Sequence, residues 1–160
     1  MKRFEKICVL GGSGFVGTYV VSELVSRGYQ VRVPTRRRES SKHLILLPTV
    51  EVVEANIHDA EVLEQVLTGC DAVINLVGIL HGNGSRFGKV HAELPKKIVA
   101  ACQKLGIQRL LHMSALNAAH NADSLYLKSK AQISLCKRQI SFYLIITTLF
   151  DLTTLSPAII

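Results

Sequence analysis

The sequence is poor in aromatic residues, which make up 6% of it and include no tryptophan, and it has no closely paired cysteines. Its four cysteines, Cys8, Cys70, Cys102 and Cys136, form no C-x-x-C pair, and no histidine stands at zinc-finger spacing from them. No metal site is therefore predicted, and the thiols are expected to be buried and reduced. Glycines interrupt the N-terminal apolar run after residue 10, which excludes a signal peptide and favours a cytoplasmic protein.

The surplus of basic residues makes nucleic acid a candidate partner. Lysine and arginine number 19 against 12 acidic residues, a net charge of +7. This charge is scattered apart from one cluster at Arg36, Arg37 and Arg38. No aromatic residues interleave with that cluster, so it lacks the stacking platform that single-stranded nucleic acid needs. We therefore predict no nucleic-acid partner.

The length and hydropathy of the chain are typical of one globular domain. Its 160 residues can bury a substantial core without disulfides or metal. A hydrophobic content of 48% and a mean hydropathy of +0.28 exclude a disordered chain and favour a sheet that is buried on both faces.

Segments rich in valine, isoleucine and leucine alternate with helical patterns, as in βαβ units. Strands are predicted over residues 6–10, 30–34, 49–55, 71–78, 107–114 and 141–150, and helices over 15–27, 60–69, 89–105 and 124–138. Asp59 is expected to begin a helix, Gly28 and Gly106 to end helices, Pro95 to start or kink one, and residues 79–88 to form a mobile loop. The predicted fold class is α/β, a Rossmann-like doubly wound parallel sheet with its crevice at the carboxyl ends of the strands.

The stretch "VLGGSGFVGTYV" (residues 9–20) places three glycines, each three residues apart, between a predicted strand and a predicted helix. In a dinucleotide-binding turn the first glycine permits a sharp bend, the second lets the backbone approach a pyrophosphate, and the third lets the helix pack closely. The amides at the helix start then face the phosphate charge. The alternative is an ordinary glycine-rich turn. The residues predicted to contact the cofactor here are Gly11, Ser13, Gly14, Phe15, Val16 and Gly17.

A basic stretch follows the second predicted strand, where proteins that bind NAD usually carry an acidic residue for the adenine ribose. The sequence there reads "VPTRRR". Arg36 and Arg37 are suited to grip a 2′-phosphate through charge-assisted bonds, which favours NADP(H) over NAD(H). The alternative is a solvated basic loop.

A tyrosine and a lysine, Tyr126 and Lys130, stand four residues apart on one face of a predicted helix. An ammonium beside a phenol lowers the phenol pKa, which suits the tyrosine for passing a proton to a carbonyl oxygen. Ser114 ends the fifth predicted strand, where its hydroxyl could polarise the same carbonyl. Alternatively, the serine merely ends a strand and the pair lies on a solvated helix face.

Four motifs, "GGSGFVG", "DAVINLVGILH", "RLLHMSAL" and "SLYLKSKA", resemble those of extended or atypical short-chain dehydrogenases/reductases. They are most similar to the branch that includes the nucleotide-binding accessory subunit of respiratory complex I and its bacterial epimerase/dehydratase-like relatives. The resemblance covers residues 5 to about 132 and implies a Rossmann fold with bound NADP(H). In that branch the cofactor can serve structure rather than turnover.

The same resemblance assigns roles to further residues of this chain. It implies that the glycines lie at the pyrophosphate, Arg36 at the 2′-phosphate, and Tyr126 and Lys130 at the nicotinamide ribose and catalytic centre. Two positions depart from the family pattern: Asn56 replaces an aspartate found in many relatives, and His91 replaces an asparagine. The residues implied near the adenine are Asn56 and Ile57, and those near the nicotinamide are Leu76, Val77 and Gly78.

The C-terminal segment shows none of the motifs that the family would place there, namely an acidic helix, a strand running into Arg-Pro and a substrate-binding region. We therefore predict an NAD(P)-binding domain over residues 1–132 and an atypical tail over 133–160, interpreted as a truncation or frameshift. A membrane anchor is the alternative because residues 142–160 are largely apolar, but Asp151 and Pro157 argue against a transmembrane span.

The sequence is compatible with two functions. The first is an NADP(H)-dependent oxidoreductase or epimerase/dehydratase-like enzyme that acts on a carbonyl or hydroxyl group of an unspecified small molecule. The second is a non-catalytic dinucleotide-binding subunit or sensor that docks on a respiratory or quinone-related complex. The first predicts a cytoplasmic enzyme, and the second predicts peripheral attachment to a membrane complex.

Overall fold

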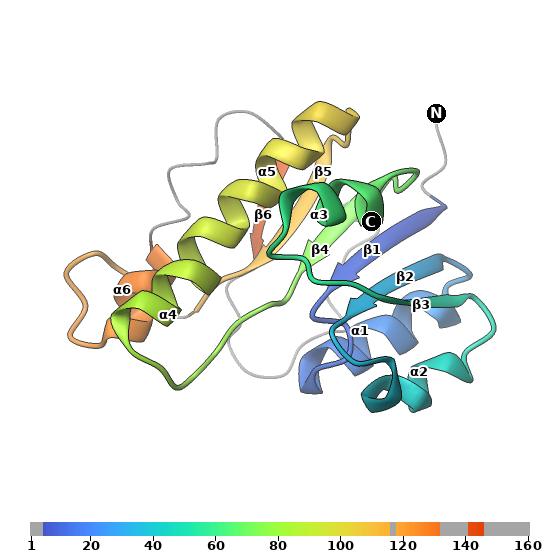
Figure 1. Ribbon diagram of the computed structural model, residues 1–160, viewed down its shortest axis with the longest axis horizontal. Coiled ribbons are helices and arrows are strands. Elements are labelled where there is room, and N and C mark those ends of the chain that lie inside the picture. Colours follow the sequence, from blue (N-terminus) through green and yellow to red (C-terminus); the bar gives the residue numbers. More distant parts are fainter. Residues whose placement is uncertain (1–4, 116–117, 132–140, 146–160) are drawn as a thin grey trace.

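A six-stranded, all-parallel sheet forms the centre of the computed structural model, which describes residues 5–115, 118–131 and 141–145. The strand order is β3-β2-β1-β4-β5-β6. Helices α3 and α5 lie on one side of the sheet and α1 and α2 on the other (Figure 1). The predicted Rossmann-like doubly wound fold is therefore confirmed.

The elements follow one another with short connections, and strands alternate with helices as predicted. The strands are β1 (Lys6–Leu10), β2 (Gln30–Thr35), β3 (Val50–Glu54), β4 (Ala72–Asn75), β5 (Arg109–Met113) and β6 (Ser141–Ile145). The helices are α1 (Phe15–Ser26), η1 (Arg38–Ser41), α2 (Lys42–Ile45), α3 (Ala60–Leu67), α4 (Gly84–Phe87), η2 (Gly88–Glu93), α5 (Leu94–Leu105) and α6 (Leu125–Ala131).

Alternate residues of the central strand pack on opposite faces, which explains the apolar composition. Cys8 and Leu10 of β1 join the core beneath α3 and α5, whereas Ile7 and Val9 join the core beneath α1 and α2. All four are essentially inaccessible to solvent. A parallel sheet covered by helices on both faces needs such continuous apolar strands.

Helix boundaries follow the capping signals in the sequence. The Asp59 carboxylate accepts hydrogen bonds from the amides of Glu61 and Val62 at 2.9 and 3.2 Å, and this begins α3. Gly28 and Gly106, with φ of +83° and +70°, follow the ends of α1 and α5 in the left-handed conformation.

Strand β4 is shorter than the predicted 71–78 because a polar side chain turns the chain out of the sheet. The Leu76 amide still donates to the Leu10 carbonyl at 2.9 Å. The next amide, of Val77, donates instead to the side-chain oxygen of Asn75 at 3.1 Å. Residues 76–78 therefore leave the strand and lie beside the glycine turn.

The predicted mobile loop over residues 79–88 is partly wrong, because it contains helix α4. The Asn83 side chain caps this helix by accepting from the Arg86 amide at 3.0 Å, and Phe87 is buried. The helical path then runs through η2 into α5. In η2 the Leu94 amide donates to the Lys89 carbonyl five residues earlier, which makes a π-helical turn. Pro95 follows directly and would clash with the carbonyl four residues before it in a regular α-helix, which explains the widened turn.

The C-terminal part of the chain is described for residues 141–145, where β6 pairs in parallel with β5. Part of the predicted sixth strand is thus present. The rest of that strand, the predicted helix beyond Ala131, Cys136, and the boundary predicted at residue 132 lie outside the described residues.

Candidate functional site

The predicted phosphate-binding turn connects β1 to α1 at the middle of the sheet's carboxyl edge. Gly11 has a φ of +80°, and a Cβ atom there would lie 3.1 Å from the backbone of residues 76 and 77. A Cβ atom on Gly17 would overlap the Gly11 carbonyl oxygen and lie 2.6 Å from the Gly12 Cα. Glycine is therefore required for the turn to pack against both β4 and the first turn of α1.

Several amides in this turn point away from protein acceptors. The Gly12 and Gly14 amides are used within the turn, where they donate to the carbonyls of Val9 and Gly11 at 3.2 and 3.0 Å. Helix α1 begins without a side-chain cap. Over the described part of the chain, the amides of Ser13, Phe15, Val16 and Gly17 have no protein acceptor. Such an uncapped helix start leaves its amides available to an anion.

The residues after the other strands converge on the same edge of the sheet. Arg36 and Arg37 follow β2, Asn56 and Ile57 follow β3, residues 76–78 follow β4, and Ser114 follows β5. The structure thus brings these residues and the glycine turn to the carboxyl ends of five neighbouring strands. Ligands of doubly wound sheets bind at this edge.

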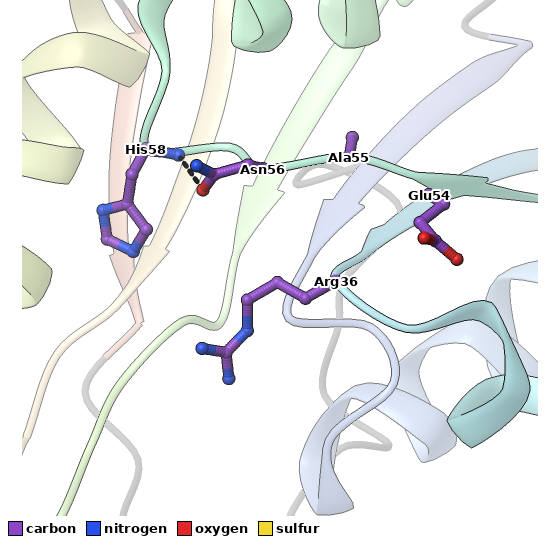
Figure 2. Close-up of a pocket in the computed structure, with 5 residues that line it drawn as sticks. All are labelled: Arg36, Glu54, Ala55, Asn56 and His58. Atoms are coloured by element: carbon purple, nitrogen blue, oxygen red, sulfur yellow. Dashed lines mark hydrogen bonds between the residues drawn. The ribbon is translucent and has the colours of Figure 1, made fainter.

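An open hollow of about 580 Å³ lies between the ends of β2 and β3. Figure 2 shows the Arg36 side chain extending beneath Asn56, with the His58 ring beside it. The residues that line the hollow are Arg36, Glu54, Ala55, Asn56 and His58. The Glu54 carboxylate also accepts from the Arg38 amide at 3.1 Å and so fixes the basic loop. Arg37 is exposed and does not line the hollow.

His58 was not predicted from the sequence. Its amide donates to the Asn56 side chain at 3.3 Å, and its carbonyl accepts from the Lys97 amine at 2.6 Å, which ties this loop to α5. Burial lowers the pKa of His58, and the charges of Lys97 and Arg36 lower it further. A histidine two positions after Asn56 carries no pattern that would have marked it as a lining residue.

The tyrosine and lysine of α6 lie at the other end of the edge. The Lys130 amine is buried and donates to the Met113 carbonyl at 3.2 Å. A Cβ atom on Gly78 would lie 3.2 Å from that amine, so the lysine sits against residues 76–78. Burial lowers the pKa of Lys130 to about 8. Ser114 is buried directly after β5.

The expected lowering of the Tyr126 pKa by Lys130 is wrong for this structure. Burial raises the pKa of the Tyr126 phenol above its usual value. No hydrogen bond joins the phenol to Lys130 within the described residues, because the amine is directed at the Met113 carbonyl. The phenol is therefore protonated at neutral pH.

Two buried histidines complete this end of the edge. The His91 ring bonds to the Ile79 amide and the Ser129 hydroxyl, and its pKa is lowered to about 4 by burial and by Lys130. The His112 Nδ1 atom lies 2.9 Å from the Asn75 side-chain nitrogen, and burial above all lowers the pKa of His112 to about 3. Both rings are therefore neutral near pH 7. The sequence marked His91 only as a departure from the family.

Within the described part of the chain, no three His, Cys, Asp or Glu side chains are placed to hold a metal ion. Cys8, Cys70 and Cys102 are buried free thiols. None of the described helices is long and apolar enough to cross a membrane.

Residues 11–159 match a family model described as NAD(P)H-binding. The chain belongs to this family. Its curated relatives are short-chain dehydrogenase/reductase-like. The chain is 29% identical over 128 residues to the mitochondrial NADH-ubiquinone oxidoreductase 40 kDa subunit of Neurospora crassa, covering 78% of this chain and 34% of that protein. It is 30% identical over 122 residues to cinnamoyl-CoA reductase 1 of Oryza sativa, covering 72% of this chain and 36% of the reductase.

Solved structures of other proteins share this fold. The dTDP-glucose 4,6-dehydratase DesIV of Streptomyces venezuelae, solved with NAD bound, superposes with a TM-score of 0.73 at 21% identity, over 86% of this chain and 54% of that one. The chain spans about a third of the length of the curated relatives described above. The family match supports a nicotinamide dinucleotide as the cofactor and does not distinguish NADP(H) from NAD(H).

Proposed function

We propose that this protein binds NADP(H) in preference to NAD(H), and that Tyr126, Lys130 and Ser114 form a centre for reduction of a carbonyl group. The observation that carries the proposal is the uncapped start of α1, with four available amides, at the centre of the carboxyl edge. The pyrophosphate would rest on these amides. The glycine turn fits it, because among the described residues only the Gly11 carbonyl oxygen, at 3.3 Å, comes within 4 Å of the position that a Cβ atom on Gly14 would take.

The preference for a 2′-phosphate is supported by the charges beside the hollow. Arg36 lines it, and the acidic residue of the same hollow, Glu54, is engaged with the Arg38 amide. A guanidinium that is free to form a bidentate bond favours a phosphate over a ribose hydroxyl. The side-chain amide of Asn56 can both donate a hydrogen bond to the adenine and accept one from it, whereas an aspartate carboxylate at this position could only accept.

The chemistry at the other end of the edge follows from the protonation states of its side chains. The bound dinucleotide supplies or accepts hydride. The protonated Tyr126 phenol is suited to donate its proton to the oxygen of a carbonyl substrate, and the Ser114 hydroxyl to hold that oxygen. Lys130, held against Gly78 by the Met113 carbonyl, is suited to bind the nicotinamide ribose.

Thermal unfolding with NADPH and NADH tests the cofactor assignment. A ligand that binds only the folded state at a hundredfold excess over its Kd stabilises the protein by about 2.7 kcal/mol. We expect NADPH to raise the melting temperature more than NADH does, and Arg36→Ala to remove the difference. Arg38→Ala is the matched control because its side chain does not line the hollow. Equal shifts with both nucleotides in the unmodified protein would refute the preference.

A second candidate is a dinucleotide-binding subunit without turnover. It is favoured by the raised pKa of the Tyr126 phenol and by the engagement of Lys130 with Met113, because neither group is activated by the other. The relative from Neurospora crassa is itself named as a subunit of an oxidoreductase. Oxidation of NADPH by a panel of aldehydes and ketones separates the two functions. Nucleotide binding without oxidation, together with co-purifying proteins, would support the subunit.

A further inference from the structure

His91 joins two parts of the proposed active site through its two ring nitrogens. The ring is 1% exposed and belongs to the π-helical turn η2. Its Nε2 atom accepts a hydrogen bond from the Ile79 amide at 3.1 Å. Its Nδ1 atom lies 2.8 Å from the Ser129 hydroxyl, which in turn donates to the Tyr126 carbonyl at 2.6 Å.

These partners determine which nitrogen carries the proton. A backbone amide can only donate, so Nε2 must be unprotonated. The Ser129 hydroxyl donates its only hydrogen to the Tyr126 carbonyl. It must therefore accept a hydrogen bond from the His91 ring, which means that Nδ1 carries the proton. Because the hydrogen-bond chain ends at a carbonyl, it offers no exit for a proton. His91 therefore acts as a fixed dipole and not as a proton relay.

The ring also packs against the side chain of Tyr126. It stacks on Phe87 with centroids 5.5 Å apart at 29°, and it meets Tyr126 edge to face at 5.6 Å and 81°. Phe87 and Tyr126 lie 6.4 Å apart. The ring of His91 thus fills the space between two aromatic side chains, and any displacement of it alters the position of Tyr126.

The two segments that His91 bonds to, the chain at Ile79 and helix α6, come close to each other at Gly78. A Cβ atom there would lie 3.2 Å from the Lys130 amine and 3.6 Å from Nε2 of His91. Residues 76–78 are the ones predicted to lie near the nicotinamide, and Ile79 follows them directly; α6 carries Tyr126 and Lys130. We infer that His91 is a positioning residue. Its Nε2 atom holds residues 76–79 and its Nδ1 atom holds helix α6, so the ring fixes these two segments relative to each other. The inference deepens the proposed function and rests on it.

Two substitutions separate the two bonds. The asparagine amide nitrogen can take the place of Nδ1, so His91→Asn keeps the donor to Ser129 and loses the acceptor for Ile79. The glutamine side-chain oxygen can reach the place of Nε2, so His91→Gln keeps the acceptor for Ile79 and loses the donor to Ser129. Ser129→Ala removes the same α6 bond without changing the ring. His81→Asn, in an exposed loop position, is the matched control.

The first experiment uses the ligand-free protein and needs no activity. Long-range ¹⁵N NMR of the histidine rings at pH 7 should show His91 as the Nδ1–H form. A ring that carries its proton on Nε2, or that titrates near the value of free histidine, would overturn the inference. This result does not depend on whether the protein binds NADPH.

The second experiment measures each segment separately. Neither substituted side chain refills the space of the ring, so the two His91 variants are compared with each other. We expect His91→Asn to speed hydrogen exchange at the Ile79 amide more than His91→Gln does, and to weaken NADPH binding about tenfold, the loss expected for one buried hydrogen bond. We expect Ser129→Ala, which keeps the ring, to shift the Tyr126 titration toward its usual value with Ile79 exchange unchanged. If Ser129→Ala also changed Ile79 exchange, or if the two His91 variants changed it equally, the positioning role would be wrong. If the unmodified protein bound no NADPH, the proposed function would fail, while exchange and titration would still decide this inference.

Discussion

Replacing His112 with asparagine should make the protein less sensitive to acid. His112 is 2% exposed, and its pKa is lowered to about 3 from an ordinary value near 6.5. Below pH 6.5 the unfolded chain therefore binds a proton that the folded chain does not. The stability that this histidine contributes is complete above pH 6.5 and is lost as the pH falls toward 3.

The size of the effect follows from this difference in proton binding. Each proton taken up only by the unfolded chain costs about 1.36 kcal/mol per pH unit. Between pH 7 and pH 5, His112 should account for a loss of about 2 kcal/mol in the free energy of unfolding. His91, with its pKa near 4, should account for a similar loss. The two together amount to about 4 kcal/mol, a large share of the stability of a typical domain.

Urea unfolding at pH 7, 6 and 5 measures this loss. The sequence has no tryptophan, so far-UV circular dichroism is the suitable signal. Asparagine at position 112 can accept from the Asn75 amide in place of Nδ1 and does not titrate, so His112→Asn should lose about 2 kcal/mol less than the unmodified protein does. His81→Asn, at an exposed position, should behave like the unmodified protein. An acid dependence of His112→Asn equal to that of the unmodified protein would refute the reasoning.

Three further predictions concern the glycine turn, a helix cap and the proposed proton donor. Gly17→Ala should lower the free energy of unfolding by about 3 kcal/mol in urea and abolish the thermal shift with NADPH, because its Cβ would overlap the Gly11 carbonyl. Asp59→Ala should cost about 1 kcal/mol through loss of the α3 cap and leave the NADPH shift unchanged; a changed shift would show that the cap also serves the site. Tyr126→Phe should abolish carbonyl reduction in an NADPH oxidation assay and keep the NADPH shift, and undiminished turnover would exclude Tyr126 as the proton donor.

Most of the fold could be predicted from the sequence because the local signals in the sequence agree with the way the elements pack. Apolar strands such as β1 and caps such as Asp59 and Gly106 act within a few residues, so they can be read without knowledge of tertiary contacts. The glycine turn was predictable for the same reason. Its three glycines allow backbone atoms to approach closely within the turn, and Gly11 also allows the backbone of residues 76 and 77 to approach.

The errors arose where contacts distant in sequence decide the outcome. The burial of Phe87 depends on packing against Tyr126 of α6, whose ring lies 6.4 Å away. The direction of the Tyr126 pKa depends on whether Lys130 faces the phenol or the Met113 carbonyl, which are equally compatible with a four-residue spacing. His58 lines the hollow only because the chain turns after Asn56.

The position of β1 between β2 and β4 also sets the order in which the sheet can assemble. β1 pairs with β2 across one short helix, but its other neighbour arrives much later: the Asp71 carboxylate accepts from the Lys6 amide across 65 residues of chain. Closing a loop of that length costs about 4 kcal/mol in chain entropy, and this cost arises before the contacts between the paired strands can offset it. We therefore expect the half formed by β1 to β3 to associate first, and the pairing of β1 with β4, which joins the two halves, to be slower.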